Sequence, residues 1–218
     1  MSLCKHCVSG VRHEGTSEGK IEQIGGVECY VATPTVDYPK DKVVLFLTDV
    51  FGIQLPNNPL LADDYARNGF KVVIPDIVGV RKVIAALRES GVTKFGALGF
   101  CYGARPCFDL AFTNEVAVVA VAHPSLLQVP ADFVRYKAES KAPLLINTCE
   151  IDSIFPAEAQ ATADEFFGEG KFAPGYQRVH WDGCTHGFAV RGDMSDPTVK
   201  AGKEGAFKAS VEWLIKYL

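Results

Sequence analysis

The sequence predicts an α/β fold, with a mostly parallel central sheet and helices on both faces. Runs rich in β-branched residues alternate along the chain with helical patterns, which is typical of parallel sheets. Residues 43–47 are apolar at every position, as expected for a strand covered on both sides. The 218 residues suffice for one substantial core, and no repeat or linker divides them. We therefore expect a single domain over residues 1–218, in which residues 1–20 can form an extended tail.

Six runs predict the strands of the parallel core. They are residues 43–50, 71–77, 94–100, 116–122, 144–149 and 176–181. Residues 22–33 predict an additional strand that precedes the core and forms half of an antiparallel edge.

Helix signals fill the intervals between these runs. Asn58 and Pro59 predict the start of a helix that Gly69 ends, and further helices are predicted over residues 81–90, 104–112 and 156–168. Asp196 and Pro197 precede the last helix. Its apolar residues share one face, which predicts docking on the sheet: Phe207, Val211, Leu214 and Leu218.

Charge and hydropathy exclude several classes of partner. Lys and Arg number 22 against 26 Asp and Glu, a formal charge of −4, and no block of like charges occurs. Nucleic acid and anionic membranes are therefore poor partners. No apolar stretch is long enough to span a bilayer, and the N-terminus lacks the apolar region of a signal peptide. We expect a cytoplasmic protein.

Seven cysteines are spread through the chain, an odd number that fits reduced thiols. Cys4 and Cys7, with His6 and His13 nearby, could supply half of a zinc site, but no second pair completes four ligands. The alternative is a surface tail with exposed thiols. We expect neither a metal nor an organic cofactor.

Cys101 lies at the centre of the motif GFCYG, residues 99–103, between a predicted strand and a predicted helix. A strand, a sharp turn and a helix with a side chain at the apex form a nucleophile elbow, here with a thiol in place of the commoner hydroxyl. The flanking glycines suit this turn, because a Cβ atom there would collide with neighbouring backbone. The alternative is a buried cysteine in an ordinary turn.

A thiol nucleophile needs a base nearby and a third group that orients the base. Asp152 and His186 each follow the end of a later strand, at the sheet edge where ligands bind. The chain order Cys101, Asp152, His186 is that of the α/β-hydrolase triad. Glu150 is a competing carboxylate and His123 a competing base, since both also lie at strand ends.

Together these segments resemble the dienelactone hydrolase family of α/β-hydrolases, particularly its eukaryotic members, along nearly the whole chain. The resemblance lies in LTDVFG at residues 47–52, GFCYG at 99–103, EIDSIFP at 150–156 and CTHGF at 184–188. It implies an α/β-hydrolase fold in which Cys101 attacks an ester or lactone carbonyl. His186 would carry the proton and Asp152 would hold the imidazole. The amides of Val50 and Tyr102 would form the oxyanion hole.

The resemblance also implies two substrate-binding residues. Asp49 stands where bacterial members carry a glutamate that contacts the resting thiol, although its side chain is one methylene shorter. Arg191 resembles an arginine that binds a substrate carboxylate, with a spacing from His186 one residue longer. One segment departs from the family. Residues 75–80 run almost directly into a helix, where the family has a longer covering segment, so either the lid is short or residues are absent from this sequence.

These observations predict a thiol-dependent hydrolase of small esters or lactones, similar to carboxymethylenebutenolidase, that acts through a covalent acyl-enzyme. Its expected substrate is a small carboxylated lactone, and we expect a monomer or a weak homodimer. Two alternatives remain. One is a carboxylesterase or thioesterase acting on a secondary metabolite, and the other is a binding protein that has kept the fold without activity.

Overall fold

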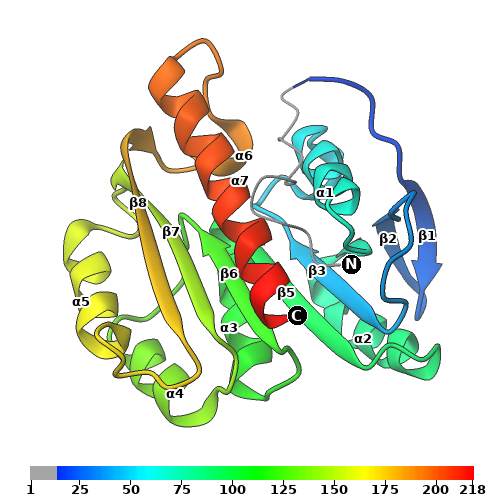
Figure 1. Ribbon diagram of the computed structural model, residues 1–218, viewed down its shortest axis with the longest axis horizontal. Coiled ribbons are helices and arrows are strands. Elements are labelled where there is room, and N and C mark those ends of the chain that lie inside the picture. The colour runs from blue at the N-terminus through cyan, green and yellow to red at the C-terminus, as the bar shows by residue number, and fades with distance from the viewer. Residues whose placement is uncertain (1–13) are drawn as a thin grey trace.

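One eight-stranded sheet organises the protein, whose computed structural model describes residues 14–218 (Figure 1). The strands are β1 (Lys20–Ile24), β2 (Val27–Ala32), β3 (Lys42–Leu47), β4 (Val72–Pro75), β5 (Lys94–Phe100), β6 (Val118–Ala122), β7 (Leu144–Ile151) and β8 (Tyr176–Thr185). Their order in the sheet is β1-β2-β4-β3-β5-β6-β7-β8. Pairing is antiparallel between β1 and β2 and between β2 and β4, and it is parallel from β4 through to β8. The predicted fold class is confirmed.

Residues 14–218 contain seven α-helices and three short 3₁₀-helices, which lie between strands except for α6 and α7, the two helices that follow the last strand. The α-helices are α1 (Asn57–Arg67), α2 (Val80–Glu89), α3 (Ala104–Phe112), α4 (Ala131–Glu139), α5 (Ala157–Phe167), α6 (Phe188–Arg191) and α7 (Pro197–Tyr217). The 3₁₀-helices are η1 (Gly52–Gln54), η2 (Ile77–Gly79) and η3 (Cys101–Gly103).

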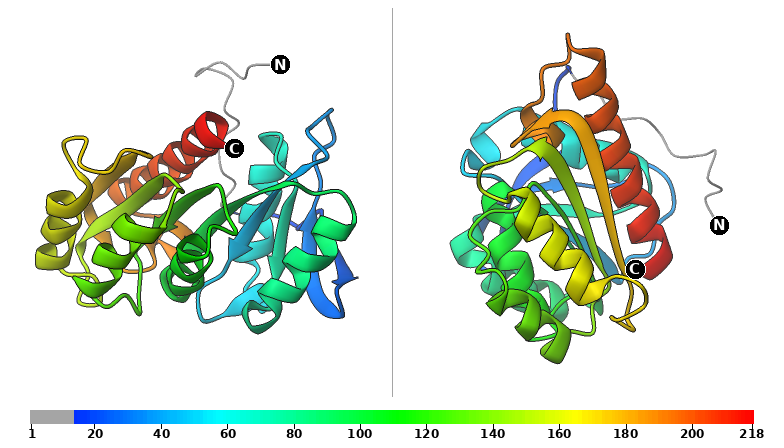
Figure 2. Two further views of the ribbon diagram at one scale, coloured as in Figure 1. Left: turned by 90° about the horizontal axis from the view of Figure 1, so that it is seen from below. Right: turned by 90° about the vertical axis from the view of Figure 1, so that its left-hand side faces the viewer.

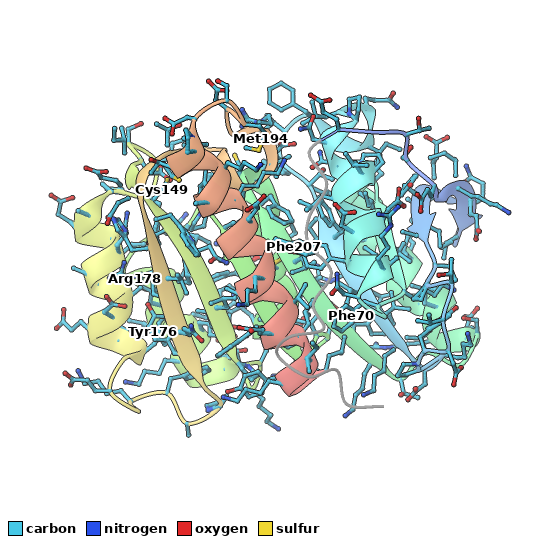
Figure 3. All side chains as sticks on the ribbon, turned by 45° about the horizontal axis from the view of Figure 1, so that its top comes forward. Phe70, Cys149, Tyr176, Arg178, Met194 and Phe207 are labelled. Atoms are coloured by element: carbon cyan, nitrogen blue, oxygen red, sulfur yellow. The ribbon has the colours of Figure 1, made fainter. Side chains whose placement is uncertain are left out.

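Helices cover both faces of the sheet, as the edge-on view shows (Figure 2). Buried residues of α1, α6 and α7 form one hydrophobic core with one face, and those of α2, α3, α4 and α5 form a second core with the other. The side chain of Phe207 extends from α7 towards α1, where its ring centroid lies 4.7 Å from that of Tyr65 (Figure 3). The predicted docking of the last helix is confirmed.

Several predicted boundaries need correction. Residues 22–33 form two strands instead of one, because Gly25 and Gly26 adopt positive φ angles of 61° and 75° and turn the chain into the hairpin β1-β2. The first helix begins at Asn57, so Asn58 lies inside it and does not cap it. Helices α4 and α6 were not predicted. Asp196 does cap α7, since its side chain accepts hydrogen bonds from the amides of Thr198 and Val199.

The connection from β4 to α2 is short, as the sequence indicates. A single 3₁₀ turn, η2, joins Pro75 to Val80, and the side chain of Asp76 accepts a hydrogen bond from the amide of Val78 at 3.0 Å. No helix within residues 14–218 has both the length and the apolar content needed to cross a bilayer. Cys4 and Cys7 lie outside the described residues.

Candidate active site

Cys101 occupies a strained turn between β5 and α3. Its φ angle of 50° is one that residues with a side chain seldom adopt. The neighbouring glycines are required by contact. A Cβ on Gly103 would lie 1.9 Å from the carbonyl oxygen of Leu47, and one on Gly99 would lie 2.6 Å from the sulfur of Cys107. The turn therefore has the geometry of a nucleophile elbow and not that of an ordinary strand-to-helix connection.

Asp152 and His186 are brought together because each directly follows the end of a neighbouring parallel strand, β7 and β8. Asp152 Oδ2 lies 2.9 Å from His186 Nδ1, and Asp152 Oδ1 accepts the amide protons of Ile154 and Phe155. Burial alone would raise the pKa of the Asp152 carboxyl, but the hydrogen bonds from His186 and the two amides outweigh it and lower that pKa. The carboxylate is thus charged and fixed against the imidazole.

The other side of the imidazole faces the thiol. His186 Nε2 is buried and has no hydrogen-bond partner within ordinary limits among residues 14–218. Burial would lower the pKa of His186, yet the hydrogen bond to Asp152 and the neighbouring Cys101 thiol raise it to about 9. Burial would raise the pKa of the Cys101 thiol, but His186, the Ser125 hydroxyl and the Tyr102 amide lower it. These opposite shifts favour a thiolate beside an imidazolium.

The lowered pKa distinguishes Cys101 from the other cysteines in the described part of the chain. Burial raises the pKa of Cys29 to about 11 and that of Cys149 to about 12, and it also raises the pKa values of Cys107 and Cys184. Those four thiols are buried, and Cys149 Sγ also donates to the Asp152 carboxylate at 3.7 Å, which favours its protonated form. Cys101 has the environment of a reactive thiol.

The competing residues occupy other environments. Glu150 accepts a hydrogen bond from the amide of Gly183 at 2.7 Å and is exposed. His123 is fully buried, and burial lowers its pKa to about 3. Its ring centroid lies 5.0 Å from that of His186, with the rings at 61°, and both of its ring nitrogens lack a partner among the described residues. His123 therefore packs against His186 as a neutral ring.

Asp49 and Arg191 form an ion pair with each other. Arg191 Nε donates to Asp49 Oδ2 at 2.9 Å, and its guanidinium carbon lies 4.9 Å from the centroid of the Phe51 ring. The side chain of Asp49 is fully buried and also accepts from Asn58 Nδ2 at 3.1 Å. No hydrogen bond joins Asp49 to Cys101 in the part of the chain that the structure describes. The structure therefore places Asp49 against Arg191 and not against the thiol.

A cavity of about 480 Å³ lies beside the elbow, at the carboxyl ends of β3 and β4. Val50 and Tyr102 both line it, so the two segments expected to form the oxyanion hole border the same space. Among the described residues, neither Cys101 nor His186 is part of the cavity lining. The space therefore extends from the elbow towards β2 and β4.

Two contacts of the site escaped the sequence reasoning. The Ser125 hydroxyl lies 3.6 Å from Cys101 Sγ, and the Ser125 amide donates to the Cys101 carbonyl at 3.0 Å. Its position two residues beyond His123, after the strand next to the elbow, was the available signal. Asn58 holds Asp49, and no feature of the sequence indicated that. Within residues 14–218, no group of three or more His, Cys, Asp or Glu side chains is arranged to hold a metal ion.

The sheet order, the elbow and the paired acid and imidazole define an α/β-hydrolase with a cysteine at the elbow. The sequence model of the dienelactone hydrolase family matches residues 27–83 and 79–218. The chain therefore belongs to the dienelactone hydrolase family. This match confirms the predicted family resemblance and the prediction that the protein is a carboxylic ester hydrolase.

Similar proteins come from fungi and animals. "Hydrolase pyvD" of Aspergillus violaceofuscus is 30% identical over 246 residues, covering 97% of this chain and 96% of the relative. "Dienlactone hydrolase 1" of Gibberella moniliformis is 29% identical over 250 residues, with 97% and 92% covered. The "Carboxymethylenebutenolidase homolog" of Mus musculus is 28% identical over 243 residues, with 97% and 96% covered.

Solved structures share the fold. A putative dienelactone hydrolase from Klebsiella pneumoniae superposes with a TM-score of 0.72 at 14% identity, covering 92% of this chain and 98% of that one. A thermophilic esterase from Thermogutta terrifontis superposes with a TM-score of 0.63 at 16% identity, with 93% and 95% covered.

The relatives carry residues that this chain lacks. Each of the three sequence alignments spans more positions than the 218 residues of the chain, so the relatives carry residues that have no counterpart here. The family model matches in two parts, which overlap at residues 79–83 around the start of α2.

Proposed function

We propose that the protein is a thiol-dependent hydrolase of small esters or lactones, in which Cys101, His186 and Asp152 form the catalytic triad. One observation carries the proposal. An imidazole is tied through Nδ1 to a buried carboxylate, while its Nε2 is left without a partner beside a thiol of lowered pKa. This arrangement combines a nucleophile, a base and a group that orients the base.

The reaction begins from a thiolate and an imidazolium. Cys101 Sγ attacks the carbonyl carbon, an S–C bond forms, and the carbonyl π electrons move to the oxygen. The amides of Tyr102 and Val50 stabilise this oxyanion, and loss of one such donor typically costs about 3 kcal/mol of transition-state stabilisation. The tetrahedral intermediate then collapses. The ester C–O bond breaks, and His186 Nε2 gives its proton to the departing alkoxide.

Deacylation reverses these roles. His186, now neutral, takes a proton from water, and the resulting hydroxide attacks the thioester carbon. The S–C bond breaks, the carboxylic acid leaves, and the thiolate and imidazolium are restored. Asp152 keeps Nδ1 protonated throughout, so Nε2 is always the nitrogen that exchanges the proton. Besides the substrate and one water molecule, each step uses side chains and amides of the chain.

Trapping the acyl-enzyme tests this proposal. Protein mixed with p-nitrophenyl acetate and quenched in acid should carry one acetyl group on the peptide that contains Cys101. Cys101→Ala should lose about 1000-fold or more in kcat, and Cys101→Ser should also be severely impaired, because a hydroxyl ionises much less readily than a thiol. The raised pKa values of Cys29, Cys107, Cys149 and Cys184 make those peptides internal controls. Wild-type turnover by Cys101→Ala would refute the mechanism.

A further inference from the structure

The cavity beside the elbow is lined by acidic and apolar side chains. Glu28, Asp49 and Asp76 are the acidic residues of its lining, although the side chain of Asp49 is buried, and the apolar part includes Ile53 and Ile77. No lysine, arginine or histidine is among the residues of 14–218 that line it. A cavity that bound a carboxylate would be expected to present a guanidinium or an ammonium group.

The charge of Asp49 is already compensated. Its carboxylate is paired with Arg191 Nε at 2.9 Å, and the guanidinium stacks over Phe51. The pair as a unit therefore adds little net charge to the site. Arg191, the arginine expected to bind a substrate carboxylate, thus donates its Nε to a buried acid of the protein itself, which offsets its charge.

The other two carboxylates are not compensated. Glu28 and Asp76 are exposed at the cavity wall, and neither forms an ion pair with another residue of the described part of the chain. Among residues 14–218, the Asp76 side chain makes one hydrogen bond, the acceptor contact to the Val78 amide, which leaves its charge in place. An anion that entered the cavity would meet two like charges.

Exposed apolar side chains surround the elbow at the carboxyl ends of five strands. Six of them, which we call the apolar rim, are Val50, Phe51, Val78, Tyr102, Leu126 and Ile154. They follow β3, β4, β5, β6 and β7 in turn and are between 38% and 95% exposed. Such side chains gather at sites that bind apolar ligands.

We propose that the site takes an uncharged ester or lactone with an apolar body, such as an aryl ester, and discriminates against a carboxylated one. This inference rests on the proposed function and adds the class of substrate. The carbonyl lies over the amides of Val50 and Tyr102, with one arm of the substrate in the cavity and the rest against the apolar rim. Glu28 and Asp76 repel substrates that carry a carboxylate into that cavity.

Two probes of nearly equal size test the inference, 4-acetoxybenzoate and its methyl ester. Each kcat/KM is divided by the rate constant for hydroxide-catalysed hydrolysis of the same probe, which removes the difference in chemical reactivity. The corrected value should favour the neutral methyl ester by about tenfold, and the preference should weaken as salt is added, because exposed charges are screened.

A double variant identifies the source of the preference. Glu28→Gln combined with Asp76→Asn removes both charges, and asparagine can still accept the hydrogen bond from Val78. The preference should fall at least about threefold. Glu89→Gln, which changes the chain's charge at the exposed end of α2, is the matched control and should keep the wild-type preference.

The outcomes separate this inference from the proposed function. Equal or faster turnover of the carboxylated probe, or an unchanged preference in the double variant, would overturn the inference while leaving the thiol mechanism intact. If neither probe is hydrolysed and Cys101 is not acetylated by either, the proposed function fails and the inference fails with it.

Discussion

Replacing Asp152 by asparagine removes the charge that holds His186 and keeps the shape of the side chain. The pKa of His186 is raised from 6.5 to about 9, against the effect of burial, by Asp152 and Cys101. This difference amounts to about 3 kcal/mol in favour of the imidazolium. If Asp152, the larger of the two favourable contributions, supplies about 2 kcal/mol, the pKa of His186 falls by about 1.5 units in the variant.

The consequence for the thiol is measurable by alkylation. In the wild type the thiolate and the imidazolium coexist between the lowered pKa of Cys101 and the raised pKa of His186. The sulfur of Cys101 is protonated as the pH falls through the lowered pKa of Cys101. The imidazolium of His186 loses its proton as the pH rises through about 9. In Asp152→Asn the thiolate loses part of this support, so iodoacetamide should label Cys101 more slowly at neutral pH, by at most about 30-fold.

Labelling rates between pH 5 and 10, followed by mass spectrometry of the Cys101 peptide, provide the assay. Glu150→Gln is the matched control, because Glu150 lies two residues away, carries the same charge and bonds only the amide of Gly183 among the described residues. It should keep the wild-type profile. A profile for Asp152→Asn that superimposes on the wild type, or an equal effect of Glu150→Gln, would refute the reasoning. Far-ultraviolet circular dichroism confirms that each variant is folded.

Three further predictions concern the stability of the elbow and its surroundings, each measured by urea unfolding. Gly103→Ala should lower the free energy of unfolding by about 3 kcal/mol or more, because its Cβ would lie 1.9 Å from the Leu47 carbonyl oxygen; a near-wild-type midpoint would contradict the assigned close approach. Cys101→Gly should be about 1 kcal/mol more stable than Cys101→Ala, since glycine adopts a φ of 50° without strain, and equal stabilities would argue against strain at the elbow. Arg191→Gln should cost about 2 kcal/mol by leaving Asp49 buried without its partner, and adding Asp49→Asn should recover much of that loss; additive effects would mean that the pair is not coupled.

The parallel core was predictable because a strand buried on both faces leaves a continuous apolar run in the sequence. The predicted limits of β5 and α3 are those observed, and these two elements flank the elbow. Helices α4 and α6 were missed for a physical reason. A helix of four residues such as α6 makes one turn, and α4 buries only two large apolar side chains, Phe133 and Tyr136, which are too few for a helical period to stand out in the sequence.

The candidate site was predictable in its chain order but not in its pairings. Asp152 and His186 follow neighbouring parallel strands, and the topology alone brings such ends together. The contact of Asp49 with Arg191 joins residues 142 positions apart through the packing of α6 against the loop after β3, which no local pattern encodes. Likewise, Glu28 and Asp76 line the same cavity only because β2 pairs with β4, and the sequence alone does not reveal this pairing.

The pairing of Asp49 also bears on how the thiol is held at rest. A carboxylate close to the sulfur would raise the pKa of the thiol and keep it protonated until substrate arrived. Here Asp49 is bonded to Arg191 and Asn58, and it is not among the main causes of the shift at Cys101, whose pKa is lowered. We infer that Asp49 does not gate the thiol and that Cys101 rests as a thiolate beside protonated His186. If so, Asp49→Asn should leave the rate of iodoacetamide labelling of Cys101 within about twofold of wild type, whereas a large increase in that rate would show that Asp49 restrains the thiol.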